Sequence, residues 1–182
     1  MKNFIGQHTH RAAYNQLRGL IDLCLHIPRE SILVEIGSYD GDSTEIWCRG
    51  CKEVHAVDPW QWRPDYHPVP FIEAEVVYQQ FKDKTARFNN LVIHRATSRE
   101  AVKAFELESI DVVYIDGFHG YEACLEDIRL WTPIVKVGGL ITGHDYLNPD
   151  TPGVTKAVQE VFGEPEMYFV DWSWLVTKKA AV

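Results

Sequence analysis

Short apolar runs that end in a glycine or an acid recur along this chain and alternate with segments of helical periodicity. The first run, residues 31–37, is apolar except for Ser31 and Glu35 and ends at Gly37. Such a run is typical of a strand buried on both faces of a parallel sheet. Strands of this kind are predicted over residues 31–37, 53–57, 91–94, 110–115 and 139–142. Because helices are predicted between them, we expect a doubly wound α/β fold with a mostly parallel sheet.

Apolar residues at helical spacing lie before, between and after these runs. The predicted helices cover residues 12–25, 43–48, 72–88, 98–105, 122–135 and 155–162. The residues expected to face the core are Leu17, Leu20, Ile21 and Leu25 in the first helix and Val76, Phe81 and Phe88 in the third. Ser98 is expected to cap the fourth helix, with Glu100 in its first turn.

The last two apolar segments predict a hairpin that closes the sheet. Residues 166–170 and 174–177 flank the polar turn at 171–173. The result is a Rossmann-like, seven-stranded sheet with an antiparallel C-terminal edge hairpin. Residues 60–88 are expected to form an insertion that covers the substrate, and residues 1–182 to form a single domain.

The composition excludes several classes of protein. A formal net charge of −8, with Lys and Arg scattered along the chain, disfavours nucleic acid as a partner. No apolar run reaches the roughly 20 residues needed to cross a bilayer, so a membrane partner is not expected. Residues 1–11 lack the apolar core of a signal peptide, and four cysteines are too few for a disulfide scaffold. A cytoplasmic location is therefore expected. Cys48 and Cys51 are placed at the end of a helix, where redox chemistry is not expected, and structural zinc is not expected because no second CxxC completes four ligands.

Polar residues gather where the predicted parallel strands end. Residues 35–43 follow the first strand, Asp58 the second, Asp116 the fourth and His144-Asp145 the fifth. Ligands of open α/β sheets bind beyond the carboxyl ends of the strands. We therefore expect these residues to form one site.

The loop after the first strand has the properties of a cofactor cradle. Gly37 and Gly41 allow a sharp turn and a close approach of a ligand to the backbone, and a helix N-terminus follows. The glycine spacing differs from the GxGxxG of dinucleotide folds, and Asp40 and Asp42 would repel a pyrophosphate. An amino-acid tail with an ammonium group fits better. Asp58 follows Glu35 by roughly 20 residues, the spacing at which an acid at the end of the second strand binds the ribose hydroxyls of a cofactor.

Two pairs of motifs resemble a known family. EIGSYDGDS at 35–43 resembles motif I of class I S-adenosylmethionine (SAM)-dependent methyltransferases, and VDPW at 57–60 resembles their acidic second motif. DGFHGY at 116–121 and GGLITGHDY at 138–146 resemble the Methyltransferase 24 group, which is related to macrocin-type O-methyltransferases and cephalosporin hydroxylase-like proteins. The resemblance covers roughly residues 31–162.

The resemblance implies SAM as cofactor, with S-adenosylhomocysteine (SAH) as product. The cofactor-binding residues it implies, together with their loop neighbours, are Glu35, Gly37, Ser38, Tyr39, Gly41, Asp42, Ser43, Asp58, Pro59, Trp60 and Asp116. It also implies a divalent cation, magnesium or another, on Asp116, His144 and Asp145. Relatives generally carry an acid where this chain has His144, and an imidazole makes manganese, iron or zinc more acceptable.

The function expected from these residues is O-methylation of a small-molecule hydroxyl. The catalytic candidates are Asp116, His119 and His144, although His119 could instead hold Asp116 or Asp145 through a hydrogen bond. Trp60, Trp62 and Tyr66 could wall the acceptor pocket, and a homodimer could complete it. The alternatives are a non-catalytic SAM- or SAH-binding or interaction protein and, third, an NAD-linked oxidoreductase, which the acidic loop disfavours.

Overall fold

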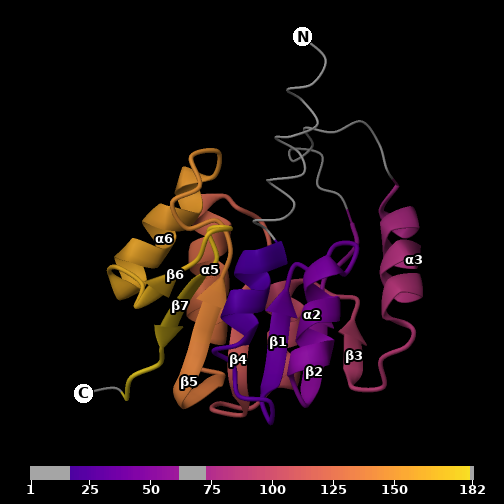
Figure 1. Ribbon diagram of the computed structural model, residues 1–182. Helices are drawn as coiled ribbons and strands as arrows, with labels where there is room; N and C mark the ends of the chain where they lie inside the picture. Colours follow the sequence, from indigo (N-terminus) through magenta and orange to yellow (C-terminus); the bar gives the residue numbers. More distant parts are fainter. Residues whose placement is uncertain (1–16, 62–72, 181–182) are drawn as a thin grey trace.

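The computed structural model describes residues 17–61 and 73–180, which form one seven-stranded sheet with helices on both faces (Figure 1). The strands are β1 (Ile32–Ile36), β2 (Glu53–Val57), β3 (Leu91–His94), β4 (Ile110–Ile115), β5 (Val135–Gly143), β6 (Met167–Tyr168) and β7 (Trp174–Thr177). Their order is β3-β2-β1-β4-β5-β7-β6, and β7 runs antiparallel to both of its neighbours while β1 to β5 are parallel. The predicted Rossmann-like fold with a closing hairpin is confirmed.

The helices fill two layers because each strand alternates its side chains between the two faces. The helices are α2 (Asp42–Gly50), α3 (Ala74–Thr85), α4 (Ser98–Ala101), α5 (Tyr121–Trp131) and α6 (Pro152–Phe162), with a 3₁₀ turn at Val102–Ala104; residues 17–24 are also helical. On β1, Val34 and Ile36 join the core formed with α4, α5 and α6, whereas Leu33 joins the core formed with α2 and residues 17–24. Figure 1 shows residues 17–24, in indigo, in front of the sheet.

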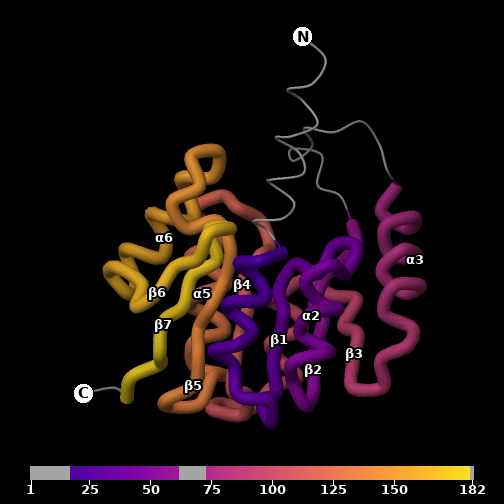
Figure 2. Tube along the Cα trace, in the orientation of Figure 1, coloured from indigo at the N-terminus to yellow at the C-terminus, as the bar shows by residue number. Residues whose placement is uncertain are grey.

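The insertion after β2 is only partly described. Helix α3 lies beside β3 at the opposite side of the molecule from α6 (Figure 2). It packs on Trp60 through Val77 and Phe81, both 0% exposed. The predicted inner residue Val76 is wrong, because that side chain is 47% exposed and its neighbour Val77 faces the core. Trp62 and Tyr66 lie outside the described residues.

Three further predictions on helices are corrected. In the first helix Leu20 is buried as expected, but Leu17, Ile21 and Leu25 are 52%, 43% and 79% exposed. Apolar residues occur on several sides of this helix, but only the side with Leu20 and Leu23 packs against the sheet.

The cap of α4 is Thr97 in place of Ser98, because Thr97 exchanges side-chain and backbone hydrogen bonds with Glu100 in a capping box.

The boundary between α5 and β5 is also shifted. Helix α5 ends at Trp131, two residues before Pro133, and β5 already begins at Val135. The sequence predicts a helix as far as residue 135 and a strand that starts only at Gly139. Here Gly138 adopts a positive φ of 81° where the register between β4 and β5 shifts, so the strand continues through an irregularity.

Candidate active site

The carboxyl ends of β1, β2, β4 and β5 meet at one edge of the sheet, and backbone hydrogen bonds hold the loops that follow them together. The amide of Gly37 donates to the carbonyl of Val57 at 2.9 Å, and that of Asp116 donates to Ile36 at 2.8 Å. The amide of His144 donates to Ile115 at 3.1 Å. The residues predicted from four separate strand ends therefore do converge.

Gly37 is required by a close approach between two loops of the protein itself. Its φ is +88°, and a Cβ atom there would lie 2.1 Å from the carbonyl oxygen of Asp116. The contact brings Asp116 directly beside the glycine loop. Gly41, with φ of +91°, precedes α2 and leaves room for Phe81 of α3, 3.0 Å from where a Cβ would be. Both glycines thus let other parts of the protein, Asp116 and Phe81, pack closely against the loop that is predicted to bind the cofactor.

Glu35 is fully buried and fixes the glycine loop to α2. Its carboxylate accepts hydrogen bonds from Ser38 Oγ at 2.7 Å, Ser43 Oγ at 2.5 Å, Trp47 Nε1 at 2.9 Å and the hydroxyl of Thr44. Burial raises the pKa of Glu35 to about 7, although these four donors oppose the increase. The side chains of Glu35, Ser38 and Ser43 therefore face one another inside the protein and position the loop.

Asp58 occupies the open side of the same loop. One carboxylate oxygen accepts the amide of Tyr39 at 3.0 Å and the other accepts the amide of Trp60 at 2.6 Å. Burial raises the pKa of Asp58, and these amides only partly offset it. The backbone amide of Ser38 also acts on Asp58. An ionised carboxylate has about four acceptor positions, so Asp58 keeps capacity for at least one more donor, such as a ribose hydroxyl.

Trp60 supports Asp58 from the interior. Its ring is 1% exposed, and its Nε1 donates to the carbonyl of Tyr39 at 2.7 Å. Tyr39 and Trp60 both have positive φ, 46° and 44°, in backbone that this bridge holds in place. Tyr39 is 51% exposed and Pro59 is partly buried. The buried Trp60 is therefore part of the support for the loop.

Lys84 of α3 compensates the acids of the glycine loop. Its Nζ lies 2.9 Å from Asp40 Oδ2 and 2.5 Å from Asp42 Oδ1. The side chain of Asp42 is otherwise 81% exposed. The expected repulsion of a pyrophosphate by an uncompensated acidic loop is therefore weaker than the sequence suggested. Lys84 is far from the loop in sequence, and no local signal pointed to it.

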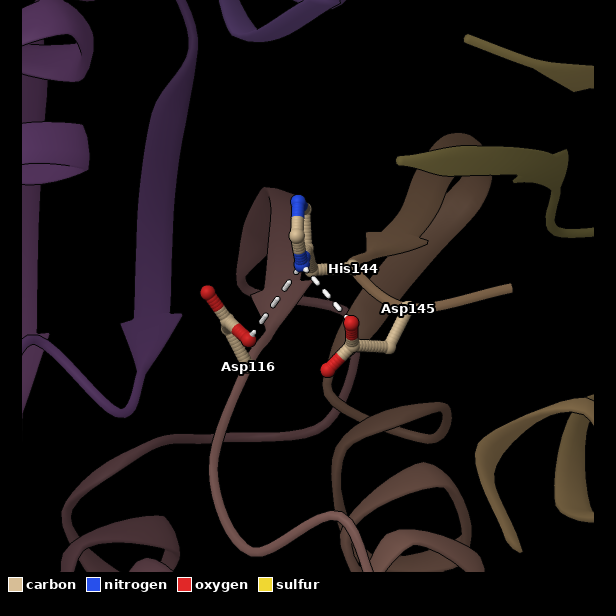
Figure 3. A group of neighbouring side chains, drawn as sticks. All are labelled: Asp116, His144 and Asp145. Atoms are coloured by element: carbon tan, nitrogen blue, oxygen red, sulfur yellow. Dashed lines mark ion pairs between the residues drawn. The ribbon is translucent and has the colours of Figure 1, made fainter. Parts of the chain in front are cut away.

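A second group of side chains lies beyond β4 and β5. Asp116, His144 and Asp145 each offer a ligand atom, and these atoms all lie within 4.8 Å of one another. Figure 3 shows one ring nitrogen of His144 facing both carboxylates and the other pointing away. His144 Nδ1 is 3.3 Å from Asp145 Oδ1 and 4.0 Å from Asp116 Oδ1. Two carboxylates and an imidazole in this arrangement can hold a divalent cation.

The acids of this group favour the positively charged form of its histidines. Burial alone would lower the pKa of His144, but Asp145, Asp116 and Asp171 outweigh it and raise the pKa to about 9. His119 Nε2 lies 3.3 Å from Asp116 Oδ1 and 3.2 Å from Asp145 Oδ2. Its pKa is also raised, because these carboxylates outweigh burial. His119 therefore bridges the two acids, the position expected for a residue that holds them.

Two members of this neighbourhood were missed in the sequence. Asn148 Nδ2 donates to Asp145 Oδ1 at 2.5 Å. Asp171 Oδ2 lies 3.8 Å from His144 Nε2, although the sequence predicts only a hairpin turn at residues 171–173. The sequence shows an acid in a turn, but it does not show that this acid is buried.

The surroundings of Cys48 and Cys51 disfavour the reactive thiolate form. Cys48 lies in the last turn of α2 and Cys51 follows the helix, as predicted. Both are buried, and burial raises the pKa of each thiol to about 12. Thiolate chemistry at neutral pH is therefore disfavoured.

In the described part of the chain, no helix is long and apolar enough to span a membrane.

Comparison with known proteins identifies the family. Residues 34–146 match the Methyltransferase 24 family, described as a methyltransferase domain. An uncharacterized protein y4gI of Sinorhizobium fredii is 29% identical over 129 residues, which are 66% of this chain and 14% of that protein. The chain thus spans about one seventh of the length of this curated relative.

Solved structures share the fold at low sequence identity. A cofactor-bound protein, Rv0187 from MTB, has a TM-score of 0.60 and 15% identity, with 91% of this chain and 80% of that chain covered. A SAM-dependent O-methyltransferase from Thermotoga maritima has a TM-score of 0.54 and 13% identity, with coverages of 79% and 49%. These similarities support the Rossmann-like fold of the chain.

Proposed function

This chain belongs to the Methyltransferase 24 family of SAM-dependent methyltransferase domains, and we propose that it methylates a hydroxyl group of a small molecule with the help of a divalent cation. The observation that carries the proposal is the convergence of Asp116, His144 and Asp145 beside the glycine loop. The family match ends at Tyr146, directly after this group, and so includes both parts of the site. The T. maritima neighbour, an O-methyltransferase, supports oxygen as the acceptor.

The residues around the glycine loop fit SAM. Asp58 has unused acceptor capacity for the ribose, and the backbone at Gly37 to Gly41 can contact the methionine part. Glu35 holds this backbone in place from inside, which agrees with a preformed site. Asp116 adjoins the loop through the contact at Gly37, which supports a role for it next to both the cofactor and the cation.

The chemistry of the second group fits a divalent cation. His144 is held as an imidazolium between carboxylates, and a cation can take the place of its Nδ1 proton. Asp116 and Asp145 supply hard oxygen ligands, and the imidazole extends the choice from magnesium to manganese, iron or zinc. A bound cation would lower the pKa of an acceptor hydroxyl, as metals do for bound water.

The protein's own residues would then align the acceptor and accept its proton. Methyl transfer is an in-line displacement, so most of the work is orientation of the acceptor oxygen towards the methyl group. Three protein ligands leave positions for two acceptor oxygens, which favours an adjacent diol or a catechol-like molecule. In the absence of a cation, the neutral imidazole of His119 or His144 would have to remove the proton, although the neighbouring carboxylates disfavour the neutral form of both rings.

The test uses cation binding before any acceptor is known. Calorimetric titration of the SAH-loaded protein with Mn²⁺ is expected to give binding that Asp116→Asn and Asp145→Asn each weaken at least tenfold, with SAH affinity nearly intact. Asp83→Asn is the matched control, because Asp83 is exposed on α3 and bonded only to Gln79 among the contacts described there.

The same variants then test catalysis. With labelled SAM and a panel of catechols and vicinal diols, transfer is expected to stop in excess chelator and to return with added cation. Full transfer in chelator would overturn the role of the cation. Loss of SAH binding in both variants would instead show that the acids serve the cofactor or the fold.

A further inference from the structure

The closing hairpin places a third carboxylate against the imidazole of His144. Asp171 lies in the turn between β6 and β7, and its side chain is 1% exposed. Its Oδ2 is 3.8 Å from His144 Nε2, the ring nitrogen that points away from Asp116 and Asp145 in Figure 3. Among the described residues this buried nitrogen has no hydrogen-bond partner. A buried donor without a partner beside a buried carboxylate needs an explanation.

The carboxylate of Asp171 is held in a fixed orientation. The amide of Ser173 donates to Asp171 Oδ1 at 3.0 Å, and the Ser173 hydroxyl donates to Oδ2 at 2.9 Å. Trp172 between them has a positive φ of 70°, which tightens the turn. Asp171 therefore has little freedom to move away from the imidazole.

The hairpin is also attached to the backbone around His144. The amide of Tyr146 donates to the carbonyl of Trp172 at 2.9 Å. The indole Nε1 of Trp174 donates to the carbonyl of His144 itself at 3.2 Å. These two bonds flank the pair formed by Asp171 and His144, so the spacing between the two side chains is set by the backbone.

The helix over residues 17–24 covers Asp171 from the other side. A Cβ atom on Gly19 would lie 2.0 Å from Asp171 Oδ1, so only glycine lets the helix backbone come so near. This contact helps to exclude water from the carboxylate. Exclusion of water strengthens the attraction between Asp171 and the ring.

From this geometry we propose that Asp171 is a positioning residue, which keeps a proton on His144 Nε2 and thereby presents Nδ1 to Asp116, Asp145 and a cation between them. A neutral imidazole has one N–H and one lone pair, so a proton fixed on Nε2 leaves the lone pair on Nδ1. Carboxylates behind metal-binding histidines commonly act in this way. The part that concerns the cation rests on the proposed function, whereas the proton on Nε2 does not.

The decisive measurement is the His144 ring proton in the full chain labelled with ¹⁵N-histidine. In the metal-free wild-type protein, NMR is expected to show an Nε2–H signal that exchanges slowly with water. In Asp171→Asn, which preserves the shape of the side chain, exchange is expected to be at least tenfold faster. Glu166→Gln is the matched control, because Glu166 is an exposed acid bonded to Thr177 at the outer part of the same hairpin.

Cation affinity provides the second measurement. Mn²⁺ is expected to bind Asp171→Asn about 10- to 100-fold more weakly than wild type, the usual cost of losing an outer carboxylate. Ser173→Ala, which retains Asp171 but frees it, is expected to change both measurements in the same direction by less, and it decides the matter if Asp171→Asn does not fold.

The two proposals fail in different ways. An Nε2–H exchange rate equal to wild type in Asp171→Asn and Ser173→Ala would overturn the role of Asp171, whatever the cation does. Wild-type protein that binds no Mn²⁺ but shows the protected proton, lost in Asp171→Asn, would remove the metal from the proposed function and leave the positioning role standing.

Discussion

Replacement of Glu35, the acid at the base of the glycine loop, tests whether burial or hydrogen bonding determines the pKa of its carboxyl group. Glu35→Ala would remove both acceptor oxygens and leave the Thr44 hydroxyl and the Trp47 N–H buried without this partner. Each orphaned buried donor costs roughly 1 to 3 kcal/mol, so we expect a loss of about 3 to 5 kcal/mol in the free energy of unfolding. Glu35→Gln keeps the shape and is expected to cost less.

The pH dependence gives this prediction its sharper form. Burial raises the pKa of Glu35 from its ordinary 4.5 to about 7 in the folded protein. The folded state therefore binds this proton more tightly, and stability falls as pH rises from about 4.5 to about 7. The difference between the two pKa values corresponds to about 3 kcal/mol. Glu35→Gln has no such proton, so wild type gains stability relative to it when the pH is lowered.

Urea denaturation of wild type and Glu35→Gln at pH 5 and pH 8 measures this difference. Other titrating groups are shared by the two proteins and largely cancel. We expect the advantage of wild type over Glu35→Gln to be larger at pH 5 by about 2 to 3 kcal/mol. Equal differences at the two pH values would show that the four donors hold the pKa of Glu35 near its ordinary value.

Three shorter predictions concern the glycine loop, the ribose acid and the thiols. Gly37→Ala is expected to lower the free energy of unfolding by more than about 2 kcal/mol, whereas Gly138→Ala, with similar φ but open space around it, should cost about 1 kcal/mol; equal losses in thermal denaturation would contradict the close contact. Asp58→Ala should weaken SAH binding by roughly 1 to 3 kcal/mol in calorimetry, and unchanged affinity would exclude it from the cofactor site. Cys48 and Cys51 should react with a thiol reagent only after unfolding, and rapid reaction of the native protein would refute their burial.

The sequence predicted the sheet well because buried parallel strands have a strong local signature. The predicted bounds of β2, β3 and β4 are those of the structure, and β1 differs by one residue at each end. Predictions were weaker at Gly138 and Gly139. The apolar residues on either side of them favour a strand and the glycines themselves disfavour one, but here both glycines lie within β5. The faces of residues 17–24 were missed because apolar residues surround that helix.

Glu35 apart, the partners of the polar side chains depend on contacts between distant elements, which no local pattern contains. Glu35 lies on the same face of β1 as Leu33, so strand alternation could have shown that it points toward α2. The ion pairs of Lys84 depend on how α3 docks, and Asp171 reaches His144 only because β7 pairs with β5. Strand ends could be predicted to converge, but their partners from distant elements could not.

Calorimetric titration of the wild-type protein with SAM, SAH and NAD in parallel tests the central assignment most directly. It needs no knowledge of the acceptor, and it compares cofactors that differ at the group facing the glycine loop. We expect SAM and SAH to bind with one site per chain and NAD to give no heat of binding. Binding of NAD with neither SAM nor SAH would contradict the assignment of the site at the ends of β1 and β2.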